Sequence, residues 1–145
     1  MDGTIYIGST EKKLYDINSD GSKKWDYTIY SSGALGISVD VTGEIYVATR
    51  RLTALSPAGA ELWEESGSNS SFIQTAVALS RYGAPYGRIN NSMKSFRSSL
   101  QRNFHGSSGA NAPVISTDGS VYAVTNGQLL ASRYDGSPAW QLDIG

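Results

Sequence analysis

One sequence pattern occurs four times along the chain, and this periodicity limits the possible folds more than any other feature. Three copies open with a glycine followed by a short run of β-branched and aromatic residues, and the third copy is weaker. The opening glycines are separated by 40, 40 and 36 residues, and they are Gly3, Gly43, Gly83 and Gly119. A fixed period of this length is typical of repeat architectures, in which each unit packs on its neighbours.

Two kinds of aromatic residue recur in phase with these glycines. A tyrosine lies three residues after each glycine, at Tyr6, Tyr46, Tyr86 and Tyr122. A second large aromatic lies 20 to 22 residues after each glycine, at Trp25, Trp63, Phe104 and Trp140. Because a large ring at one phase of every unit is best used between units, we expect the second set to pack neighbouring units together.

Within a unit, short apolar runs alternate with polar turns, which is typical of β-strands. Over the first 41 residues we expect strands at 4–7, 13–17, 24–29 and 34–41, with a turn at Asn18-Ser19-Asp20-Gly21. Four short strands in about 40 residues indicate a propeller blade. We therefore predict an all-β fold, a β-propeller of four-stranded antiparallel blades with about four repeats. The approximate repeat boundaries are 1–32, 33–71, 72–110 and 111–145.

The third unit departs from the pattern. Pro85 falls inside a predicted strand, which is tolerated mainly at an edge or a bulge. Met93, Phe96, Leu100 and Phe104 are spaced by 3, 4 and 4 residues, which is a helical spacing. We favour strands over residues 90–104, because the repeat phase is independent evidence and the helical spacing depends on four residues.

The combination of Asp-Gly, Ile/Val-Tyr, a Leu-rich run, a second Asp-Gly and a tryptophan resembles the repeat of the quinoprotein alcohol dehydrogenase-like (PQQ-like) β-propeller family. Examples are Asp2-Gly3 with Ile5-Tyr6, and Asp118-Gly119 with Val121-Tyr122. The resemblance extends over nearly the whole chain but is faint in the third unit. It implies that the repeat tryptophans join adjacent blades, with Phe104 as a poorer substitute.

The family contains quinone-dependent dehydrogenases as well as non-enzymes, such as an outer-membrane assembly lipoprotein. The enzymes have an adjacent cysteine pair and long insertions that hold calcium and the quinone. This chain has no cysteine, and 145 residues leave no room for such insertions. We therefore expect no catalytic residue, no cofactor and a non-catalytic scaffold or binding module. The alternative is part or a remnant of a quinoprotein (PQQ-dependent) dehydrogenase whose cofactor residues lie outside this chain. The resemblance alone favours a periplasmic, cell-surface or secreted location.

One turn offers a weak candidate for a metal site. Asp16, Asn18 and Asp20 match the opening of a calcium-binding loop. The position that should supply a bidentate glutamate is instead Tyr27. We therefore expect an ordinary Asx turn here.

Charge is unevenly distributed along the chain. The net charge is −1, which argues against nonspecific nucleic-acid binding. Residues 66–117 contain no acid but include Arg81, Arg88, Lys94, Arg97 and Arg102. These five residues could form a face for an anionic partner, although such clusters more often form a solvated surface. No apolar run approaches the about 20 residues needed to cross a membrane, so we expect no membrane insertion.

The phase of the repeats also bears on assembly. The chain begins on the second strand of its first blade, so we expect four blades that lack one strand. Single-chain propellers usually have more blades than this, up to about eight. We therefore expect either a homodimer that completes a propeller or a segment of a longer propeller, with another protein as a further candidate partner.

Overall fold

A computed structural model describes residues 3–31, 36–65, 76–89, 92–96, 102–104, 112–125, 127–135 and 137–145. Within these residues the chain forms four antiparallel sheets. The first sheet contains β1 (Ile5–Gly8), β2 (Lys13–Ile17) and β3 (Lys23–Thr28). The second contains β4 (Gly36–Val39), β5 (Ile45–Ala48), β6 (Leu52–Leu55) and β7 (Glu61–Glu65). The third contains β8 (Ala78–Leu79), β9 (Pro85–Ile89), β10 (Ser92–Ser95) and β11 (Arg102–Phe104). The fourth contains β12 (Val114–Ile115), β13 (Val121–Thr125), β14 (Gln128–Ser132) and β15 (Pro138–Asp143).

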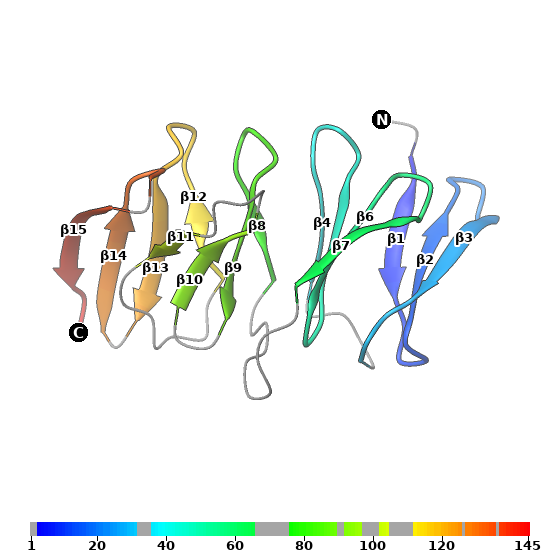
Figure 1. Ribbon diagram of the computed structural model, residues 1–145, viewed down its shortest axis with the longest axis horizontal. Helices are drawn as coiled ribbons and strands as arrows, with labels where there is room; N and C mark the ends of the chain where they lie inside the picture. The colour runs from blue at the N-terminus through cyan, green and yellow to red at the C-terminus, as the bar shows by residue number, and fades with distance from the viewer. Residues whose placement is uncertain are drawn as a thin grey trace.

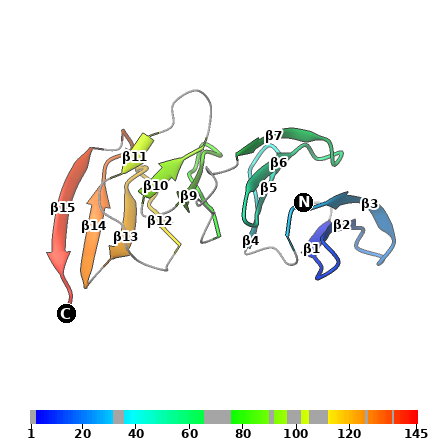
Figure 2. The same ribbon diagram turned by 60° about the horizontal axis from the view of Figure 1, so that its bottom comes forward.

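The sheets stand side by side in one row, in chain order, with the N-terminus in the first sheet and the C-terminus at the far end (Figures 1 and 2). Within each sheet, strands adjacent in sequence are hydrogen-bonded neighbours. This arrangement confirms the predicted all-β fold, including the strands expected within residues 90–104. Among the described residues, no helix has the length and apolar character needed to span a membrane.

Three sheets share the same cross-strand register around the repeated aromatic residues. In the first sheet Tyr6 is paired with Asp16, which is paired with Trp25. The equivalent sets are Tyr46, Ala54 and Trp63 in the second sheet and Tyr122, Ala131 and Trp140 in the fourth. The tyrosine and tryptophan ring centroids lie 6.0, 6.1 and 5.8 Å apart in these sheets. A register shift follows the middle residue in each set, so even the irregularity of the ladder is repeated.

The third sheet has a different register. Tyr86 is paired with Ser95, which is paired with Arg102, whereas Phe104 is paired with Met93. The position that tryptophan occupies in the other sheets therefore belongs to Arg102. Pro85 is the first residue of β9, a position at which a strand tolerates proline because few ladder hydrogen bonds are lost.

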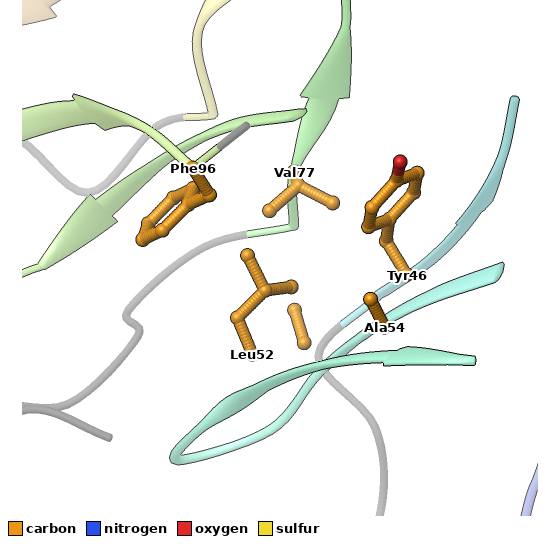
Figure 3. Packing of buried hydrophobic residues seen from close by; sticks show 6 residues of the cluster. Tyr46, Leu52, Ala54, Val77 and Phe96 are labelled. Carbon is orange, nitrogen blue, oxygen red and sulfur yellow. The ribbon is translucent and has the colours of Figure 1, made fainter. Parts of the chain in front are cut away.

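The hydrophobic core lies between the sheets. One cluster joins the first and second sheets and contains Leu14, Ile29, Ile45, Val47 and Leu55. A second cluster joins the second and third sheets and contains Tyr46, Ala48, Leu52, Ala54, Val77 and Phe96 (Figure 3). A third joins Tyr86 in the third sheet to Val121 in the fourth. Because β5 contributes to two clusters, all four of its residues are buried.

The second and third sheets approach closely where β4 lies beside the residues that precede β8. The Ser38 hydroxyl donates a 2.8 Å hydrogen bond to the carbonyl of Val77. A Cβ atom added to Gly36 would lie 2.4 Å from the Cβ and 3.0 Å from the Cα of Ala76. The backbones of these two sheets can approach this closely only because residue 36 has no side chain.

This contact predicts the effect of a single methyl group. Gly36→Ala should lower the free energy of unfolding by about 1–3 kcal/mol, the usual cost of overpacking, as measured by urea denaturation. Adding Ala76→Gly should restore part of the loss, because it removes the nearer of the two clashing atoms. Identical unfolding midpoints for the Gly36→Ala and unchanged chains would contradict this close approach.

Candidate interaction surfaces

The contact between the first and second sheets is an aromatic ring placed on a glycine turn. The Trp25 ring lies over Gly59, where an added Cβ would be 2.7 Å from the indole ring. The indole nitrogen of Trp25 donates a 3.2 Å hydrogen bond to the carbonyl of Pro57 in the same turn. Gly59 has a φ of +80°, a conformation that glycine adopts without strain. The turn thus supplies both a flat surface for the ring and an acceptor for its polar edge.

Polar contacts support the same junction. The Tyr27 hydroxyl donates a hydrogen bond to the Glu61 carboxylate of the second sheet. Burial of the phenol and this hydrogen bond raise the pKa of Tyr27, so its neutral form persists. The Arg51 guanidinium carbon lies 3.9 Å from the centre of the Tyr30 ring, and the same side chain forms an ion pair with Glu64. Each of these groups therefore has a partner at or beside the junction.

The second junction uses the next tyrosine and tryptophan of the repeat. Trp63 packs against the cluster that contains Tyr46 and Val77. The Tyr46 hydroxyl lies 2.7 Å from Glu44 Oε2 and 3.3 Å from the carbonyl of Gly83 in the third sheet. The inter-blade role of Trp25 and Trp63 stays a prediction, which these contacts support. The side chain of Phe104 lies outside the description, so its inter-blade role stays a prediction.

The two ends of the row expose faces whose equivalents are buried at the junctions. Ile5 and Ile7 of β1 are 52% and 54% exposed, whereas the equivalent Ile45 and Val47 of β5 are fully buried. At the other end of the row, Trp140 is 49% exposed. Val124 and Leu142 on the same face are also exposed. The first and fourth sheets therefore end the row with apolar surface, rather than with the polar outer faces typical of terminal repeats.

The candidate calcium residues take part in a different arrangement. The Asp20 carboxylate accepts hydrogen bonds of 2.9 and 2.7 Å from the backbone nitrogen and the hydroxyl of Ser22. The Asn18 amide donates to the same hydroxyl, while Asp16 is buried within β2. These are the hydrogen bonds of an Asx turn. In the described part of the chain, no three histidine, aspartate or glutamate side chains gather closely enough to hold a metal ion.

Hydrogen bonds to exposed carboxylates, including that of Asp20, lower their pKa. The side-chain hydrogen bond from Ser22 lowers the pKa of Asp20, and that from Ser116 lowers the pKa of Asp118. Hydrogen bonds from Lys13 and then Lys23 lower the pKa of Asp26 to about 2. These acids remain ionised near neutral pH, and each is engaged in stabilising its own turn or sheet.

The five basic residues of the third unit occupy different environments. Arg81 is exposed beside Tyr82, Lys94 is half-buried in β10 and Arg88 is 7% exposed in β9. Arg97 and the side chain of Arg102 lie outside the described residues. Arg81 is thus available to an anionic partner whereas Arg88 is largely withdrawn from solvent. A common anionic-partner face for the five stays a prediction.

Sequence reasoning did not find the residues that receive the tryptophan. The repeat does not indicate that Pro57 and Gly59 contact a ring of the preceding unit, nor that Tyr27 meets Glu61. The available signal was the glycine that closes each such turn, at Gly21 in the first unit and Gly59 in the second. The repeat predicts the position of each residue within its own unit, but it does not predict which residue of the next unit contacts it.

Comparison with known proteins identifies the architecture. No protein-family model and no curated protein matches the chain. A crystal structure of BamB from Moraxella catarrhalis matches with a TM-score of 0.71 and 14% sequence identity, covering 98% of this chain and 49% of BamB. The chain therefore spans about half the length of that structure. At this identity the likeness establishes the fold, which is part of a β-propeller.

The Trp25 contact predicts graded losses of stability. Trp25→Ala should cost about 3–5 kcal/mol, because it removes the ring that fills the junction. Trp63→Ala should cost a similar amount, as measured by denaturant unfolding. Trp25→Phe should cost less, because it loses the hydrogen bond of about 1 kcal/mol but keeps most of the apolar contact. Trp140→Ala, measured at low protein concentration, is the control and should cost less stability, since about half of that side chain is exposed. Unchanged stability of Trp25→Ala would rule out the proposed inter-blade role.

Proposed function

We propose that this chain is a non-catalytic propeller scaffold of the PQQ-like repeat type that binds partners through its apolar end faces. The observation that carries the proposal is the contrast between equivalent strands of the first two sheets. Ile5 and Ile7 are half exposed on β1, but Ile45 and Val47 are buried on β5 by the neighbouring sheet. Exposed apolar faces of this kind mark interaction surfaces.

The polar residues support the same proposal. The acids of the turns, such as Asp20 and Asp118, are engaged by serine residues of their own turns. The partner of the end faces is a second copy, the remainder of a longer propeller or another protein. By family resemblance this binding takes place in the periplasm, at the cell surface or outside the cell.

A dye that fluoresces on apolar protein surfaces tests the binding face directly. At low protein concentration, anilinonaphthalene sulfonate should fluoresce with the unchanged chain. The double variant Ile5→Ser, Ile7→Ser should lose the part of this signal that comes from β1 and keep the part from the exposed Trp140 face, while its circular dichroism spectrum stays unchanged. Val41→Ser is the matched control, because Val41 is 85% exposed and lies in a turn rather than on β1. Equal dye fluorescence from the double variant and the control would contradict an apolar docking face.

Titration with pyrroloquinoline quinone and calcium tests the competing enzymatic function. We expect no saturable change in quinone absorbance and no alcohol-dependent reduction of an electron-accepting dye. Saturable binding of one quinone per chain together with dye reduction would overturn the non-catalytic assignment, whatever the state of assembly.

A further inference from the structure

The junction between the first and second sheets provides a template for a contact that the ends of the row can make. Its donor half is Trp25, which is placed by Tyr6 and Asp16 of its own sheet. Its acceptor half is the turn at Gly59, with the Pro57 carbonyl as the hydrogen-bond acceptor. Apolar residues on both sides then bury one another beneath the ring.

The fourth sheet presents the donor half of this junction. Trp140 is held as Trp25 is, opposite Ala131 and beside the ring of Tyr122. Leu129 and Leu142 occupy the registers of Leu14 and Tyr27, which line the template junction. Yet Trp140 is 49% exposed and Leu142 is 55% exposed. The face is complete, but the chain places no further sheet against it among the described residues.

The first sheet presents the acceptor half. The turn at Gly21 matches the turn at Gly59: both glycines have positive φ values, +86° and +80°, and both donate a 2.9 Å hydrogen bond, to the carbonyls of Asn18 and Ser56 respectively. At Gly59 the Trp25 ring fills the space where the Cβ atom of any other residue would lie. Around Gly21 no described heavy atom lies within 4 Å of that position. By the same alignment, the Ser19 carbonyl corresponds to the Pro57 carbonyl that accepts the indole hydrogen bond.

The apolar residues beneath this turn are equally matched. Ile5 and Ile7 stand at the registers of Ile45 and Val47, which the first sheet buries completely. A second donor face placed on β1 would cover both isoleucines. The two ends of one chain are therefore the two halves of a junction that the same chain already forms internally.

We propose that a second copy of this chain supplies the missing halves, so that Trp140 of each copy docks on the Gly21 turn of the other. The inference rests on the proposed scaffold function and gives its apolar end faces a specific partner. Two copies related by a twofold axis form two identical junctions and leave neither face exposed, which is the closed symmetry usual for homo-oligomers. One chain matches 49% of the BamB structure, so two chains have the length of one such propeller.

The seam is weaker than the internal junctions. Within the described residues the first sheet has three strands, so it lacks the equivalent of β4. Inner-strand contacts such as Ser38 with Val77, or Gly36 with Ala76, are therefore not available from that sheet at the seam. We expect association in the micromolar range of concentration rather than a dimer that cannot be dissociated.

Light scattering coupled to size exclusion tests the proposal on the unchanged chain. The expected mass is about twice 15.5 kDa at high concentration, falling toward 15.5 kDa on dilution. Trp140→Ala and Ile7→Glu should each weaken association by about 30-fold or more, the effect of removing a central interface residue. Both positions are exposed, so circular dichroism should confirm that the variants fold. Val41→Ser should associate like the unchanged chain.

Mixing the two variants gives a result that only the paired junction explains. A mixed pair places both substitutions at one seam and leaves the other seam unchanged, so mixing Trp140→Ala with Ile7→Glu should produce dimers that neither variant forms alone. A folded monomer of the unchanged chain at every concentration would overturn the proposal. So would a dimer that both variants retain, or a mass above two chains. If monomers still bind the dye through Ile5 and Ile7, the docking partner is wrong but the scaffold function stands.

Discussion

The structure depends on an aromatic ring from one sheet lying on a glycine turn of the next. A sheet of three or four short strands cannot bury enough apolar surface alone, so it must cover its faces with neighbours. The Trp25 ring does this by meeting Gly59 at a distance that no side chain would allow, while its polar edge bonds to Pro57. Burial depends on having a neighbouring sheet: β5, with a sheet on each side, is buried at every residue, whereas β1 has two half-exposed isoleucines.

Much of this fold could be predicted from the sequence because each unit repeats the same local chemistry. Glycine spacing and alternating apolar residues gave the strands, and the recurring ring gave the phase of the packing residue. Spacing alone could not reveal that Phe104 lies opposite Met93 while Arg102 takes the tryptophan register. A ladder can shift by two residues without changing which face a side chain occupies, so the pattern looks unchanged. The acceptors Pro57 and Gly59 were missed because periodicity describes one unit and not its neighbour.

The same physical constraint connects the fold to function. Repeat proteins generally need terminal units with polar outer faces to remain dispersed in water. Here the two outer faces keep the apolar residues of an interior junction, including Ile5, Ile7 and Trp140. Some charged residues, by contrast, are engaged within their own sheet, as Asp26 is with Lys13 and Lys23. The exposed apolar ends of the row are therefore the observation on which our proposal of a scaffolding role rests.

A double-mutant cycle between Trp25 and Gly59 tests the central contact most directly. With the ring present, Gly59→Ala introduces both an unfavourable backbone conformation and a clash with the indole. In the Trp25→Ala background only the conformational cost of about 1 kcal/mol remains, because no ring is left to meet the new methyl group. Denaturant unfolding should therefore give a coupling free energy of about 1–3 kcal/mol between the two sites. Costs that add to within about 0.5 kcal/mol would contradict the docking of this ring on this turn.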